Sequence, residues 1–333
     1  MDYTLISRKT LFFFSFLITL LVVLTASKCT HTSNLSLGPI PFPADNPLTE
    51  EKIALGRKLF FDKRLSDDNT VACADCHFPE KAFTDGKVKS DGVGGEHTER
   101  NASSMLNSAY LPRVMFDGEL KTLEMQVIVP IQEHSEMASN MLQLIKELKG
   151  IPEYEAAAQR IFNRSFDPWV LTRSIAAFER SLVSQNSPYD RYMAGDSLAL
   201  TTSQKRGLHL FSVELNCVGC HPGPHFTTYT IENNGLYLDY GKDQGRYRIN
   251  NLESDKGLFK VPSLRNSVLT APYMHDGSLA TLNDVLDHYQ KGGAKHVNQS
   301  KKILPFTLSD QQRKDLLNFF EALTDTSYMK DFQ

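Results

Sequence analysis

Two short cysteine motifs contain the residues whose spacing points most directly to chemistry. The first spans residues 73–77 and the second spans residues 217–221. Both read C-x-x-C-H, with thiols at Cys73, Cys76, Cys217 and Cys220 and histidines at His77 and His221. Two thiols at this spacing add to the vinyl groups of a haem, and the adjacent histidine ligates the iron. We therefore predict two covalently bound c-type haems, with His77 and His221 as the proximal ligands.

Zinc binding and dithiol redox chemistry are the alternatives for these motifs. A structural zinc site needs its two cysteine pairs at short separation. Here Cys76 and Cys217 are 141 positions apart, and each pair has its own histidine. A redox C-x-x-C pair is compatible with an exported protein, but it does not require a trailing histidine twice. The spacing therefore favours haem.

Residues 1–28 are typical of an export signal. Basic Arg8 and Lys9 precede an apolar run over residues 11–24, and small residues follow before Cys29. This run is shorter than the roughly 20 residues that cross a bilayer. Cys29 resembles the lipid-acceptor cysteine of bacterial lipoproteins, with simple cleavage or an uncleaved anchor as alternatives. We expect a protein on the periplasmic side of the cell envelope, attached to the membrane only through a lipid anchor.

The remaining composition is that of an ordinary globular chain. With 36 basic and 39 acidic residues, the formal charge of −3 provides no field that would attract nucleic acid. The 333 residues suffice for about two domains. No repeat of 20–50 residues is evident beyond the two haem motifs.

Helical patterns dominate the elements that must position these motifs, so the predicted fold class is all-α. Capping residues and apolar periodicity predict helices over residues 49–62, 141–149, 167–182, 201–211, 281–289 and 309–323. The helix over residues 141–149 is expected to stop at Gly150 and Pro152, and the helix after Asp167 is expected to end at residues 186–188. At most one small hairpin is expected, between residues 227–231 and 236–240.

The motifs and helices together predict two c-type cytochrome-like domains, each with one haem. The signal segment covers residues 1–28, and a linker covers residues 29–45. An N-terminal peroxidatic haem domain then spans residues 46–185. A C-terminal electron-transfer haem domain spans residues 186–333.

Further motifs make the chain resemble the bacterial dihaem cytochrome c peroxidases and the related enzyme MauG. The resemblance covers about residues 45–325. The segments that carry it, besides the haem motifs, are residues 55–62, 65–66, 116–118, 123–126, 136–137, 178–180, 259–266 and 271–277. In this family the first haem is the peroxide site, and the second haem passes or stores electrons.

The resemblance implies that Glu124 is the distal carboxylate that moves a proton between the two peroxide oxygens. Without the resemblance, the sequence favours a surface position for Glu124, paired with Lys121. The glutamine that the family places ten residues earlier is Val114 here.

The resemblance also suggests the remaining iron ligands. His97 is the candidate distal ligand of the first haem, with a solvated loop histidine as the alternative. Tyr289 lies 14 residues after His275, where MauG-like members have a ligating tyrosine and the peroxidases a methionine. Tyrosinate stabilises oxidised iron, whereas methionine raises the reduction potential. A packed tyrosine, Met274 and His288 remain alternatives for the second haem.

Family peroxidases hold calcium between the two haem domains, and the matching residues here are Asn101, Thr270 and Pro272. Oxygen ligands of this kind suit calcium. The family also places a tryptophan between the haems. The only tryptophan, Trp169, does not match that position, and Tyr110 lies nearer to it.

These observations predict an exported dihaem enzyme that reduces hydrogen peroxide to water. A small cytochrome c or cupredoxin would supply the electrons, and a homodimer is expected because family members are often dimers. A MauG-like enzyme that oxidises residues of a partner protein is the first alternative. A dihaem electron carrier without catalysis is the second.

Overall fold

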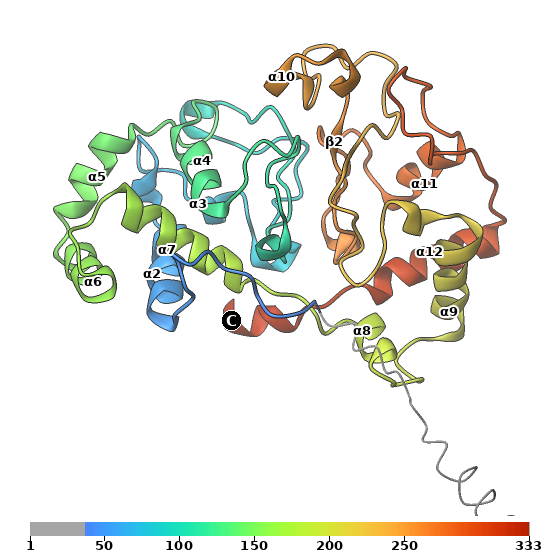
Figure 1. The fold of residues 1–333 in the computed structure, drawn as a ribbon, viewed down its shortest axis with the longest axis horizontal. Coiled ribbons are helices and arrows are strands. Elements are labelled where there is room, and N and C mark those ends of the chain that lie inside the picture. Colours follow the sequence, from blue (N-terminus) through green and yellow to red (C-terminus); the bar gives the residue numbers. More distant parts are fainter. Residues whose placement is uncertain (1–36, 333) are drawn as a thin grey trace, which may run out of the picture. The chain divides into compact units, whose positions relative to one another are not determined.

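Helices joined by long loops make up most of the chain that the computed structural model describes, residues 37–332 (Figure 1). The α-helices are α2 (Glu50–Phe60), α3 (Leu123–Gln126), α4 (Ile128–Gln132), α5 (Met141–Lys149), α6 (Pro152–Phe162), α7 (Pro168–Ser181), α8 (Pro188–Met193), α9 (Thr202–His209), α10 (Tyr247–Asn250), α11 (Leu282–Gln290) and α12 (Asp310–Ala322). The mostly helical prediction is confirmed. The predicted signal segment and Cys29 lie outside the described residues. Within residues 37–332, no helix has the length and apolar character needed to cross a bilayer.

Side-chain caps fix the starts of the predicted helices. The Asp167 carboxylate accepts from the backbone N–H of Val170 and starts α7. Thr281 and Ser309 cap α11 and α12 in the same way, each in a reciprocal capping box. These starts were predicted from sequence and are confirmed.

Two further helices begin at prolines that the sequence analysis took as helix stops. Pro152 and Pro188 each occupy the first turn of a new helix, α6 and α8. Proline suits this position because the first N–H groups of a helix have no partner within it. The helix before Pro152 ends at Lys149 as expected, whereas α7 ends at Ser181, earlier than the predicted end at residues 186–188.

The expected hairpin does not form. The strand β1 (Ile231–Glu232) pairs in antiparallel fashion with β2 (Phe259–Lys260), and residues 236–240 are irregular. The Asn233 side chain accepts from the backbone N–H of Gly235, and the Asn234 side chain accepts from that of Leu236. These local hydrogen bonds hold the loop in place of a hairpin ladder.

The helices pack around two hydrophobic cores. In the first, α2 crosses α7 at Gly56, where an added Cβ would lie 1.8 Å from the Ser174 carbonyl oxygen. In the second, α9 crosses α12 at Gly207, where an added Cβ would lie 2.0 Å from the Asp315 carbonyl oxygen. Both helix pairs are visible in Figure 1. Only glycine permits helix backbones to approach so closely. The predicted domain boundary between residues 185 and 186 stays a prediction.

The backbone reveals an internal repeat that the sequence analysis missed. Residues 107–123 and 266–282 have the same residue at eight of 17 positions. Asn107 and Asn266 both start a short 3-10 turn with positive φ, at 62° and 59°. The same correspondence holds for Met115 and Met274, with φ of 70° and 76°. Each segment therefore presents the same loop after its haem motif.

Charged side chains connect residues 100–117 with residues 243–248. Arg100 donates two hydrogen bonds to the Asp243 carboxylate, at 2.7 Å each, and a third to Asp117 at 3.1 Å. Asp117 is fully buried and also accepts from Arg248. Bidentate arginine–carboxylate pairs of this kind fix orientation as well as distance.

Candidate functional site

The first cysteine motif holds its histidine in the orientation that an iron ligand needs. Cys73–Asp75 form a 3-10 turn, and the Nδ1 atom of His77 lies 2.7 Å from the carbonyl oxygen of Phe83. A hydrogen bond from Nδ1 to this carbonyl leaves Nε2 free to bind iron. Burial lowers the pKa of His77, which keeps the imidazole neutral, as ligation requires.

The second motif repeats this arrangement. Cys217–Gly219 form the same kind of turn, and His221 Nδ1 lies 3.0 Å from the carbonyl oxygen of Phe226. Burial again lowers the pKa of His221. The two acceptor residues, Phe83 and Phe226, share the left-handed backbone conformation, with φ of 59° and 54°.

The four cysteines fit covalent haem attachment better than the alternatives. None of the thiols in the described chain forms a disulfide. Burial raises the pKa of Cys76 to about 11 and that of Cys217 to about 12, so these thiols are not the thiolates of a reactive dithiol. Among the described residues, no group of three or more His, Cys, Asp or Glu side chains could hold a metal such as zinc. Both motifs thus provide two thiols and one oriented imidazole, the set that a c-type haem needs.

Glu124 is buried, contrary to the alternative in which it pairs with Lys121 at the surface. It lies in the first turn of α3, is 8% exposed and forms a bidentate pair with Arg180 at 2.6 and 2.8 Å. Asn46 donates a further hydrogen bond to it at 2.8 Å. Burial raises the pKa of Glu124, but Arg180 and Asn46 outweigh burial and hold it below its usual range. The structure therefore places a fixed, ionised carboxylate at this position.

A second buried carboxyl group, Glu179, was not predicted as a site residue. It is 3% exposed, and its Oε2 atom has no hydrogen-bond partner among the described residues. Burial raises its pKa to about 8, and it interacts electrostatically with both Glu124 and Cys73. Glu179 thus links the Glu124 pair to the first haem motif. Its only sequence signal was its place in the Phe-Glu-Arg motif before Ser181.

The position of the missing glutamine is apolar in the structure as well. Val114 is 5% exposed and packs in a small cluster with Leu123. No side chain at this position can donate a hydrogen bond, so Glu124 and its partners supply the polar chemistry predicted for this region.

Candidate ligands of the second haem gather around Asn234. The Asn234 side-chain amide donates to Met274 Sδ at 3.2 Å, and His288 Nε2 lies 3.0 Å from the Asn234 carbonyl oxygen. Tyr289 also has a side-chain hydrogen bond with Asn234, while burial raises its pKa to about 12. Electrostatic interactions with Cys217 and Cys220 contribute to this raised pKa of Tyr289. The geometry favours Tyr289, and its ligation stays a prediction.

His97 lies at the surface beside the first motif. Its side chain is 61% exposed, and its Nδ1 atom lies 3.1 Å from Asp91 Oδ1. The backbone carbonyl of Asp91 lies 3.9 Å from Cys76 Sγ. The prediction that His97 ligates the first haem stays untested, and its present partner is the Asp91 carboxylate.

The residues predicted to bind calcium come from segments that meet. The Asn101 N–H donates to the His275 carbonyl oxygen at 2.9 Å, which brings Asn101 beside the segment with Thr270 and Pro272. The Asn101 amide donates to the Lys87 carbonyl oxygen at 2.6 Å, so its own oxygen remains available as a ligand. The donor set fits calcium, and the site stays a prediction.

Tyr110, rather than Trp169, contacts the segment that follows the second haem motif. Its ring lies 5.0 Å from His225, four residues after His221, and His225 lies 5.6 Å from Tyr229. Trp169 instead packs between Phe162 and Arg173, at 5.7 and 4.0 Å. The sequence analysis left the inter-haem relay open, and the relay stays an open question.

Comparisons with known proteins agree with this geometry. The family model described as di-haem cytochrome c peroxidase matches residues 50–198. The methylamine utilization protein MauG of Methylorubrum extorquens is 38% identical over 287 residues, covering 85% of this chain and 81% of that protein. Cytochrome-c peroxidase IdrP1 of a Pseudomonas species is 35% identical, covering 96% and 93%. The crystal structure of a MauG-like protein associated with microbial copper homeostasis is 33% identical, covers 88% of this chain and 95% of that one, and has a TM-score of 0.83.

Proposed function

The chain belongs to the di-haem cytochrome c peroxidase family, and we propose that it is a peroxidase that reduces hydrogen peroxide to water. Haem iron held by His77 supplies the redox centre and a coordination position for peroxide. One peroxide, two electrons and two protons give two water molecules. The buried Glu124 carboxylate carries this proposal, because an electron carrier has no need of a fixed carboxylate there.

Glu124 acts as the proton carrier of the reaction. As a carboxylate, it accepts a proton from the incoming peroxide and returns it to the oxygen that leaves as water. Arg180 and Asn46 hold both of its oxygens, so its position is set before substrate arrives. This preorganisation avoids the cost of reorienting the acid during the reaction.

Electrons enter through the second haem from a small cytochrome c or cupredoxin. The chain works on the periplasmic side of the cell envelope, attached through lipid on Cys29. Calcium at Asn101, Thr270 and Pro272 stabilises the contact between the two haem domains, and the enzyme is a homodimer. These four statements extend the sequence predictions, and the Asn101 contacts described above support the calcium site.

A MauG-like oxidation of a partner protein is the second candidate function. Tyr289 favours it, because a tyrosinate ligand stabilises oxidised iron and suits the storage of oxidising equivalents. The two candidates share the peroxide site and differ in the source of electrons.

A titration of the diferric holoprotein with one equivalent of hydrogen peroxide tests both. Optical and EPR spectra would show prompt loss of the ferric signals if the first haem is open and the second stores oxidising equivalents, which supports the MauG-like function. Reaction only after one-electron reduction, followed by turnover with reduced cytochrome c, supports the peroxidase. No reaction in either state would leave only an electron carrier and contradict the proposal.

A further inference from the structure

The last described residues of the chain return to the first haem motif. The 3-10 helix η10 (Ser327–Phe332) follows α12, yet its side chains belong to the first hydrophobic core. Tyr328 is 7% exposed, and its hydroxyl donates to the carbonyl oxygen of Pro79 at 3.0 Å. Pro79 is only two residues beyond His77. The segment therefore reaches the immediate surroundings of the proximal histidine.

Phe332 anchors η10 in this position. Its ring lies 5.4 Å from Phe83 and 6.2 Å from Phe178, both in edge-on contact. The Arg57 guanidinium lies 4.7 Å from the centre of the Phe332 ring and also donates to the Asp331 carbonyl oxygen at 2.5 Å. Arginine–aromatic and edge-on ring contacts of this kind are both attractive.

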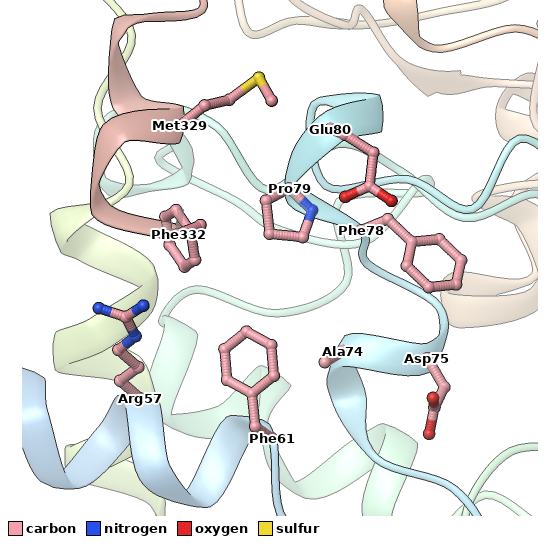
Figure 2. A pocket seen from close by; sticks show the side chains of 9 residues that line it. All are labelled: Arg57, Phe61, Ala74, Asp75, Phe78, Pro79, Glu80, Met329 and Phe332. Atoms are coloured by element: carbon pink, nitrogen blue, oxygen red, sulfur yellow. The ribbon is translucent and has the colours of Figure 1, made fainter.

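A cavity separates η10 from the haem-attachment turn itself. Figure 2 shows Met329 and Phe332 on one side of it and Ala74 and Asp75 of the turn on the other. Its volume is about 570 Å³. The direct contacts of η10 beside His77 are those of Tyr328 and Phe332 with Phe83 and of the Tyr328 hydroxyl with Pro79.

Phe83 is the residue through which this contact reaches the iron ligand. Its carbonyl oxygen lies 2.7 Å from His77 Nδ1, and its φ of 59° is unusual for a bulky side chain. Such a conformation persists only when the surrounding packing fixes it. The rings in contact with Phe83 are those of Phe60, Tyr328 and Phe332, and two of these three belong to η10.

The aromatic support of the second motif comes from the second core alone. The rings around Phe226 are those of Tyr189, Phe211 and Phe319, all in helices near it in the second core. The two acceptor phenylalanines are alike in backbone and differ in where their support comes from.

We propose that η10 is a positioning element for His77. By packing on Phe83, Tyr328 and Phe332 keep its carbonyl directed at His77 Nδ1. That hydrogen bond fixes the ring and makes the imidazole a stronger electron donor to a bound iron. The inference rests on haem attachment at the first motif, as in the proposed function. It adds a segment that positions the proximal histidine of the first haem and leaves the second haem unaffected.

The variant Phe332→Ala in the full holoprotein tests this role. We expect the EPR signature and the reduction potential of the first haem to shift, with those of the second haem unchanged. The reaction with peroxide should slow by about tenfold, the lower end of the effect of losing a hydrogen-bond partner of a metal-binding histidine. Lys330→Ala, an exposed residue of the same segment, is the matched control and should change neither haem.

Phe332→Leu keeps an apolar side chain but removes the ring. It should shift the EPR signature and the reduction potential of the first haem in the same direction by a smaller amount. The test therefore does not depend on whether the alanine variant folds. An unchanged first haem in both variants, or equal changes in both haems, would overturn the proposal. The spectral shift of the first haem would support it even if the wild-type protein did not react with peroxide, an outcome that contradicts only the proposed function.

Discussion

The segments after the two haem motifs follow the same backbone course with different chemistry at two positions. Residues 107–123 and 266–282 share their asparagine, methionine and glycine positions with positive φ, and each continues into a helix capped by threonine. In the first segment the second helical residue is Glu124, and in the other it is Asn283. Six positions after Asn283, α11 has Tyr289, whereas six positions after Glu124 the chain has Pro130, which lies in α4.

The difference shows how one structural unit can serve two tasks. A carboxylate at the start of the helix equips the first unit for proton transfer, and the second unit has only an amide there. A tyrosine one or two turns later gives the second unit a candidate iron ligand, and proline cannot bind iron. A third difference lies in the crossing helices, where Glu179 of α7 corresponds to Phe320 of α12 when Gly56 and Gly207 are matched.

Replacing Glu124 tests the first of these differences and should have the largest effect. Glu124→Gln keeps the shape and removes the ionisable group, so the reaction with peroxide should slow by about 10²- to 10⁴-fold. Stopped-flow absorbance of the haem bands measures this rate. Asn283→Gln, at the matching position, should leave the rate unchanged. Equal losses in both variants would mean that the two positions do not differ in function.

Tyr289→Phe tests the second difference. We expect the second haem to lose its tyrosinate signature in EPR and its reduction potential to rise on the order of 100 mV, within the roughly 0.8 V that axial ligands span. The first haem should be unaffected. Met274→Leu serves as the control and should leave the spectrum as it is. A change with Met274→Leu and none with Tyr289→Phe would identify methionine as the ligand.

Glu179→Gln tests the third difference, with the smallest expected effect. The folded protein holds the pKa of Glu179 at about 8, above the usual 4.5, so it binds more protons than the unfolded chain between these values. The free energy of unfolding should therefore fall as pH rises from about 4.5 to 8. At pH ~5 the variant and wild type should have the same free energy of unfolding. At pH ~8.5 that of the variant should be higher by at least about 1.4 kcal/mol, the equivalent of one pKa unit. Urea unfolding followed by circular dichroism would detect this, and parallel stability curves would contradict it.

The haem motifs and the capped helices could be predicted from the sequence, because each depends on residues close together in the chain. It did not reveal the partner of Glu124, since Arg180 is 56 positions away and no local pattern connects them. Pro152 and Pro188 misled the helix prediction, because proline is as compatible with a first helical turn as with a stop. The expected hairpin failed for a similar reason: Asn233 and Asn234 satisfy the loop's own N–H groups.

The internal repeat escaped notice because its shared residues are scattered. Three of the shared positions have positive φ, among them Gly118 and Gly277 at 64° and 68°. Glu179 was missed because burial and the lack of a partner, which define it, are properties of packing.

The contact of Tyr328 and Phe332 with Phe83 also has a consequence for the order in which the protein matures. Translation reaches Tyr328 about 245 positions after Phe83. Until then, Phe83 lacks two of the three aromatic rings that surround it. The surroundings of Phe83 are therefore completed only after this much later segment has been synthesised and has folded back over it.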